Sequence, residues 1–206
     1  MSRLSALLST QLTAEQQAVL DAIVGGKRGD GRALGGFLDQ RGAMRGPFNA
    51  MLHRPDLGLV LQRLGEILRF EARLPAAQRE IAILVVASHW RARYEWWAHA
   101  RIAREAGVAE ATIEAIRRGA APHLDEPASA AIHAFAAELV GKRRVCDATY
   151  ERAVDALGEA VVVELVVLLG YYSCISMVLN AFEVALPPGE MDPFEDDREG
   201  VHDGSR

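Results

Sequence analysis

The stretch AAQREIAILVVASHWRARYEWWAHARIAREAG, from Ala76 to Gly107, decides the fold. It follows Leu74-Pro75, and a proline is well tolerated at the start of a helix, so we expect a helix from Ala76 to Ala87. A turn is expected over residues 89–93. A second helix then ends at Gly107, because glycine is the commonest residue to close a helix. The stretch therefore predicts two helices joined by a turn.

Helix signals continue on both sides of this stretch. Thr13 and Gln16 form a capping box, and Gly25-Gly26 closes the helix that follows. A glycine-rich loop is expected from Gly26 to Gly46. Further helices are predicted from residue 55, over 109–118, over 127–141, from a cap at Asp147 to residue 158, and over an apolar segment at 160–186. Strand signals are nearly absent, so the sequence predicts an all-α bundle of roughly seven to eight helices.

Length and composition suggest three parts. Half of the 206 residues are hydrophobic, which is enough for a sizeable core without disulfides or metals. We expect an N-terminal helix and loop extension at 1–45, a helical domain at 46–188, and an acidic, disordered tail at 189–206.

Charge and cysteine content exclude several classes of protein. The net charge is −5 and no basic stripe is present, which argues against nucleic acid as a partner. Two widely separated cysteines and no visible secretory signal indicate a cytoplasmic protein. Glu164 interrupts the 160–186 segment, which argues against a membrane span. We expect this helix to lie in the core or between the subunits of a homo-oligomer.

Three residues could carry acid–base chemistry. Glu95 and His99 are four residues apart, so they share one face of a helix. A carboxylate beside an imidazole fixes the tautomer and raises the imidazole pKa. Glu80 lies among apolar residues, where an unpaired carboxylate is costly to bury. If the two helices pack antiparallel, Glu80 comes opposite His99 and can share its proton.

Each of these residues also has an ordinary structural interpretation. A Glu–His pair at this spacing is commonly a solvated surface contact. Trp96 and Trp97 are typical core or interface anchors. Glu80 could pair with a structural arginine such as Arg91. Spacing alone therefore suggests a site without establishing it.

No metal site is predicted. The histidines outside the motif lack the close spacing to Asp, Glu or Cys that is typical of zinc sites. These are His53, His89, His123, His133 and His202. Asn49 could line a cavity, or it could serve in capping and loop hydrogen bonds.

The order Leu74-Pro75, Arg79-Glu80, Tyr94-Glu95-Trp96-Trp97-Ala98-His99 and Ala106-Gly107-Val108 resembles the carboxymuconolactone decarboxylase family. Its superfamily also contains the alkylhydroperoxidase D proteins, and the likeness runs from about residue 46 to 187. The resemblance implies an alkylhydroperoxidase D-like helical bundle. The peroxidase branch carries a Cys-x-x-Cys pair at the positions of Ala92 and Glu95. Peroxide reduction by that route needs thiols, so we do not expect thiol peroxidase activity.

The resemblance implies a decarboxylase-like enzyme without cofactor, acting on a small carboxylated lactone in aromatic compound catabolism. His99 would be the acid or the oxyanion partner, and Glu80 and Glu95 would orient it and exchange protons. Substrate contacts are expected from Tyr94, Trp96, Trp97 and Asn49. The alternatives are an isomerase, hydrolase or dehydratase that uses the same relay, or a non-catalytic oligomeric binding protein.

Overall fold

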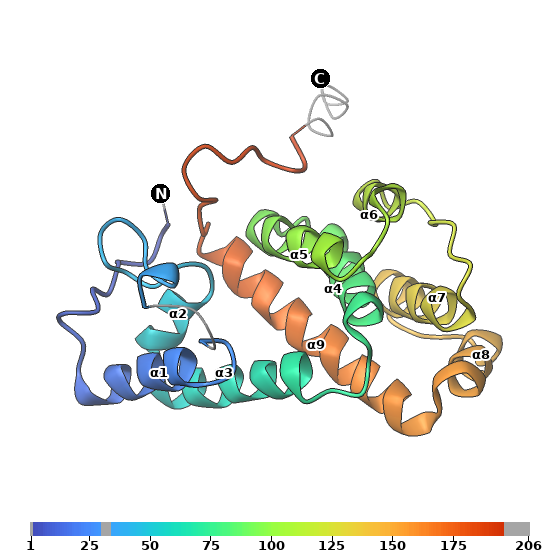
Figure 1. The fold of residues 1–206 in the computed structure, drawn as a ribbon, viewed down its shortest axis with the longest axis horizontal. Coiled ribbons are helices and arrows are strands. Elements are labelled where there is room, and N and C mark those ends of the chain that lie inside the picture. Colours follow the sequence, from blue (N-terminus) through green and yellow to red (C-terminus); the bar gives the residue numbers. More distant parts are fainter. Residues whose placement is uncertain (1, 30–33, 196–206) are drawn as a thin grey trace, which may run out of the picture. The chain divides into compact units, whose positions relative to one another are not determined.

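A computed structural model of the 206-residue chain describes residues 2–29 and 34–195 (Figure 1). Within these ranges it has nine α-helices, one short 3-10 helix and no strand, which confirms the all-α prediction. The chain divides into two compact units. The first is Met1–Ala72 with Val178–Ala185, and the second is Arg73–Met177 with Leu186–Arg206. This division differs from the boundary predicted near residue 45, because the helix that begins at Pro55 packs on the N-terminal helix.

The first unit contains α1 (Ala14–Gly25), η1 (Leu34–Gly36), α2 (Phe48–His53) and α3 (Pro55–Phe70). The predicted capping box opens α1: Gln16 N donates to Thr13 Oγ1, and Thr13 N donates to Gln16 Oε1. Helices α1 and α2 both pack on α3. The sequence did not predict α2, because six residues are too few to show a period. Residues 30–33 of the predicted loop lie outside the described ranges.

The second unit is built around α4 (Ala76–His89), whose apolar run Ile81–Ala87 is buried throughout. Helix α4 packs on α5 (Arg93–Glu105), α6 (Glu110–Arg117) and α7 (Pro127–Lys142), and α7 packs on α8 (Asp147–Leu157). The turn predicted between α4 and α5 is present. Arg91 takes a positive φ there, and Ala92 N donates to Ala87 O.

Two predicted helix ends are wrong in detail. The N-cap residue of α8 is Cys146, so Asp147 is the first helical residue rather than the cap. The last helix, α9 (Glu159–Ala181), ends five residues before position 186. Glu183 has a φ of 49°, and Val184 N donates to Leu179 O, which closes the helix.

Helix α9 is long and apolar enough, by length and composition alone, to cross a membrane. Its second-unit part, up to Met177, exposes Val163, Val166, Val167 and Met177. These positions recur at helical spacing, so they form one apolar face.

The tail predicted to be disordered from residue 189 is partly folded. Residues up to Glu195 are described, and the side chain of Phe194 is only 1% exposed. A buried aromatic ring fixes this segment on the second unit. The rest of the predicted tail, 196–206, lies outside the described residues.

Candidate functional site

The three predicted catalytic residues come together in the second unit, where α4 packs on α5. Glu80 is on α4, and Glu95 and His99 are on α5. All three are buried, with exposed fractions of 0%, 4% and 5% respectively. The interpretation of Glu95 and His99 as a solvated surface pair is therefore wrong.

Both ring nitrogens of His99 face a carboxylate. Its Nδ1 lies 2.6 Å from Glu80 Oε2, and its Nε2 lies 3.2 Å from Glu95 Oε1. A neutral imidazole carries one N–H, whereas an imidazolium carries two and can donate to both carboxylates. The arrangement therefore favours the charged form of His99.

Burial and charge act in opposite directions on His99. Burial is the largest single influence and lowers the pKa, because a low-dielectric interior disfavours the imidazolium. The charge of Glu80 and the hydrogen bonds to Glu80 and Glu95 together outweigh it. The net result raises the His99 pKa from 6.5 to about 9. A pKa of about 9 keeps the His99 imidazole protonated at neutral pH.

One arginine side chain, that of Arg79, lies beside the site. Arg79 Nε lies 3.7 Å from Glu80 Oε1, at the long end of an ion pair. The structure gives Arg91, the arginine considered from sequence as a partner of Glu80, a different set of contacts. It donates to the Phe194 carbonyl, and its guanidinium lies 4.9 Å from the centre of the Phe194 ring.

Tyr172, on α9, is a site residue that sequence reasoning missed. Its ring centroid lies 4.9 Å from that of His99, with an angle of 82° between the planes. Tyr171 contacts Tyr172 in the same perpendicular manner at 5.2 Å, and both tyrosines are buried. The sequence did not single out this pair, because an apolar helix gives no sign of which of its side chains meets His99.

The aromatic residues of α5 make two separate sets of contacts. Tyr94 and Trp97 lie against each other with ring centroids 5.3 Å apart, and Arg101 lies 5.2 Å above the Trp97 ring. Within the described residues, the buried Nε1 of Trp97 has no hydrogen-bond partner. Trp96 instead packs edge-to-face on Phe194 at 5.5 Å. The position of Trp96 is that of a core anchor, which was its alternative interpretation.

Asn49 belongs to the first unit. Its Oδ1 accepts from Leu7 N and its Nδ2 donates to Ser5 O. These are the loop hydrogen bonds considered for it from sequence. Its substrate contact stays a prediction.

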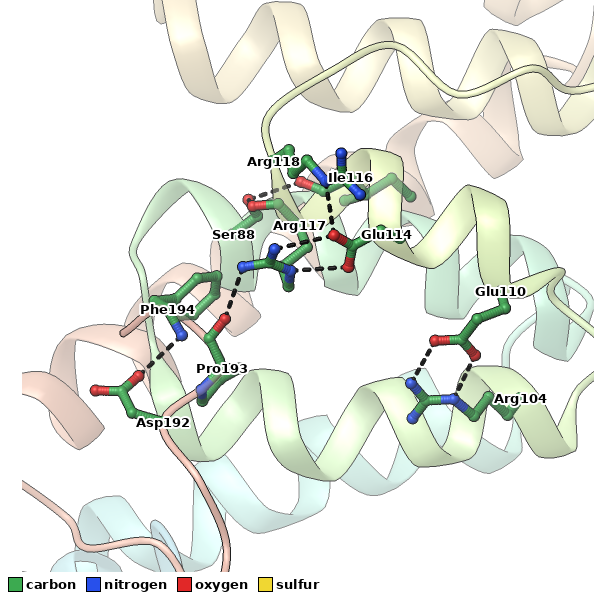
Figure 2. Close-up of polar contacts among 10 residues, drawn as sticks. All are labelled: Ser88, Arg104, Glu110, Glu114, Ile116, Arg117, Arg118, Asp192, Pro193 and Phe194. Atoms are coloured by element: carbon green, nitrogen blue, oxygen red, sulfur yellow. Dashed lines mark hydrogen bonds and ion pairs between the residues drawn. The ribbon is translucent and has the colours of Figure 1, made fainter. Parts of the chain in front are cut away.

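The C-terminal segment 192–195 is tied to the second unit by polar contacts (Figure 2). Arg117 donates to the Pro193 carbonyl and forms two hydrogen bonds with Glu114. Phe194 N donates to Asp192 Oδ1. The ion pairs with Arg117 and Arg118 lower the pKa of Glu114 to about 2, so Glu114 stays charged over the physiological pH range.

The two cysteines occupy sequence positions other than 92 and 95, where the cysteine pair of the peroxidase branch would stand. Cys146 is exposed, Cys174 is half-buried, and neither is in a disulfide. Position 92 is a fully buried alanine and position 95 is the carboxylate on His99. Among residues 2–29 and 34–195 no group of three or more His, Cys, Asp or Glu is placed to hold a metal ion.

Comparison with known proteins places this geometry in context. Residues 55–138, which include Glu80, Glu95 and His99, match the model of the Carboxymuconolactone decarboxylase family. A solved structure with a similar fold is an uncharacterized peroxidase-related protein from Ralstonia eutropha JMP134, described as an alkylhydroperoxidase AhpD core. The similarity covers 91% of this chain and 93% of that one, with a TM-score of 0.69 and 15% identity. No curated protein matches the sequence.

Proposed function

We propose that this chain, of which residues 55–138 match the Carboxymuconolactone decarboxylase family model, is a decarboxylase-like enzyme acting by proton transfer, without a cofactor. Its substrate class is a small carboxylated, unsaturated lactone such as 4-carboxymuconolactone. The observation that carries this proposal is a buried imidazole with a carboxylate on each ring nitrogen. Such a group stores a proton in a water-poor environment, which is what protonation of a carbanion requires.

The reaction balances with these groups alone. The bond between the lactone ring and the departing carboxylate breaks, CO2 leaves, and the electron pair spreads onto the lactone carbonyl as a dienolate. His99 supplies the proton that quenches the dienolate at carbon, and water later restores that proton. The unsaturated lactone itself accepts the electron pair.

The two contacts of His99 suggest different roles for the carboxylates. The contact to Glu80 is the shorter one, and Glu80 is fully buried, so we assign it to holding the ring and its charge. The contact to Glu95 is 3.2 Å, which is 0.6 Å longer than the 2.6 Å contact to Glu80. In the proposal the substrate carbon that is protonated takes the place of Glu95 at Nε2. Glu95 then exchanges the proton with solvent between turnovers.

We test this proposal by measuring CO2 release from 4-carboxymuconolactone by the wild type and by His99→Ala. We expect release by the wild type and a loss of at least about 100-fold in the variant, the usual scale for removing a general acid. Full activity in the variant would show that the reaction does not need His99. Activity only on lactones without a carboxylate would favour the isomerase or hydrolase alternative.

Thiol peroxidase activity is not part of the proposal. The positions that would need cysteines carry Ala92 and Glu95. Hydroperoxide reduction driven by a dithiol is therefore expected to be at background in the wild type and unchanged in Cys146→Ser and Cys174→Ser. A wild-type rate that is lost in either variant would instead indicate thiol chemistry.

We further propose that a second copy of the chain covers the apolar face of α9 formed by Val163, Val166, Val167 and Met177. Four exposed apolar side chains at helical spacing form a continuous patch, and such patches commonly mark subunit interfaces. A symmetric contact would bury the same face of both copies. We propose a cytoplasmic location for this homo-oligomer, consistent with its two unpaired cysteines.

A further inference from the structure

We propose that Arg79 binds a carboxylate of the substrate, namely the one that stays on the lactone after CO2 leaves. This inference rests on the proposed function and adds the residue that anchors and orients the substrate. The observation behind it is that Arg79 lies beside Glu80. Its guanidinium makes long contacts with the described residues.

The contacts of Arg79, which is half-buried, are long. Its Nε lies 3.7 Å from Glu80 Oε1, and an end nitrogen of its guanidinium donates to the Leu74 carbonyl at 3.5 Å. The Nε atom is buried, and in the part of the chain that the structure describes it has no hydrogen-bond partner. Buried polar groups are normally paired, so an unpaired one near a reactive group indicates a missing ligand.

Other arginines of the second unit are satisfied by the protein itself. Arg104 holds Glu110 with two hydrogen bonds of 2.6 and 2.7 Å, and Arg117 holds Glu114 in the same two-pronged way (Figure 2). This paired geometry is the preferred arrangement of a guanidinium on a carboxylate. Among residues 2–29 and 34–195, Arg79 has no carboxylate in this paired geometry, and a carboxylate ligand would supply it.

The position of Arg79 fits a ligand that also reaches His99. Arg79, Glu80, His99 and Glu95 follow one another with alternating charge, each in contact with the next. The side chain of Arg79 is 12% exposed, more than that of any other member of this row, so it is the member most open to a solute. A carboxylate bound to Arg79 would therefore lie next to a residue that contacts Glu80, the partner of His99.

The chemistry decides which carboxylate Arg79 holds. 4-Carboxymuconolactone has two, and only one leaves as CO2. A guanidinium paired with the departing group would stabilise the reactant and oppose its conversion to neutral CO2. Binding the retained carboxylate stabilises reactant and transition state alike, and it positions the ring for proton delivery.

Calorimetric titration with muconolactone tests the inference, because muconolactone keeps one carboxylate and lacks the one that leaves. The proteins are the wild type, Arg79→Met, Arg79→Lys and the control Arg104→Met. We expect binding by the wild type and a loss of about 10- to 100-fold in Arg79→Met, the scale of a hydrogen bond to a charged group. The control should stay within about 2-fold, since Arg104 pairs with Glu110 at the surface.

Arg79→Lys separates ligand binding from a structural role. Lysine keeps a positive charge beside Glu80 but cannot form the paired geometry. If Arg79 only balances the charge of Glu80, the lysine variant will bind as tightly as the wild type, which would overturn the inference. A loss that persists in this folded variant, as judged by circular dichroism, supports it.

The outcomes also separate the inference from the proposed function. Arg79-dependent binding without CO2 release from 4-carboxymuconolactone would refute the decarboxylase and keep the carboxylate site. CO2 release with an unchanged KM in Arg79→Met would keep the decarboxylase and refute the site. Absence of muconolactone binding by the wild type would also refute the site.

Discussion

Glu80 Oε2 lies 2.6 Å from His99 Nδ1, although the two residues are 19 positions apart and belong to different helices. The contact is buried, so water does not screen it, and the two charges stabilise each other. Removing the charge of Glu80 while keeping its shape is the sharpest way to measure this coupling.

Glu80→Gln should lower the pKa of His99. Both the charge and the hydrogen bond of Glu80 raise this pKa, and burial, which lowers it, stays in place. We expect a shift of at least about one unit, observed by NMR titration of the imidazole. Glu114→Gln is the matched control, because Glu114 pairs with Arg117 and Arg118. An unchanged His99 pKa in Glu80→Gln would contradict the coupling.

The protein should lose stability as the pH rises through the His99 pKa. The folded pKa of about 9 exceeds the unfolded value of 6.5, so the contribution is fully present below about pH 6.5 and is lost as the pH rises through about 9. The full shift corresponds to about 3 kcal/mol. Urea unfolding at several pH values, compared with His99→Gln, measures it. A difference between the two proteins that stays constant from about pH 6 to pH 10 would contradict the raised pKa.

Phe194→Ala should destabilise the second unit by about 2 kcal/mol or more, because a buried phenyl ring leaves a cavity when removed. The ring contacts Trp96 and Arg91, so tryptophan fluorescence should also report its loss. The measurement is urea unfolding of the purified variant. Met191→Ala is the control, since Met191 is 84% exposed and its change should stay within about 0.5 kcal/mol. Equal stability of the two variants would show that the segment is not held by Phe194.

Helix positions followed from local signals in the sequence, whereas the Glu80–His99 pair also needed an assumption about packing. Each helix end is marked by residues close to it in the sequence, such as the cap at Thr13 and the Pro and Gly residues at other ends. These signals therefore locate the helices closely. The pairing followed from a single assumption, that two neighbouring helices pack on each other. The carboxylate on each ring nitrogen is a consequence of that packing and the spacing of four between Glu95 and His99.

Features that depend on contacts between distant segments could not be predicted. Tyr172 meets His99 from another helix, and an apolar segment shows no face pattern that would single it out. Phe194 is one aromatic residue in an acidic stretch, a composition that favours disorder. Its burial depends on the ring of Trp96 and the guanidinium of Arg91, which no local pattern reveals. The same limit applies to α2, which at six residues is held by packing on α3.

Val163→Lys should dissociate the proposed oligomer. Val163 is 64% exposed on the apolar face of α9, and a buried lysine without a partner at an interface is unfavourable. Light scattering should show the wild type as an oligomer and the variant as a smaller species. Met191→Lys, which adds the same charge at an exposed position outside α9, should leave the mass unchanged. A monomeric wild type, or an unchanged mass in Val163→Lys, would contradict this interface.

The central claim, that a positioned acid delivers the proton to the dienolate, is tested most directly by the product formed from 4-carboxymuconolactone in D2O. NMR of the wild-type product should show one deuterium, on one face of the newly protonated carbon, because His99 reaches the ring from a single side. Deuterium distributed over both faces, or no product at all, would contradict the claim.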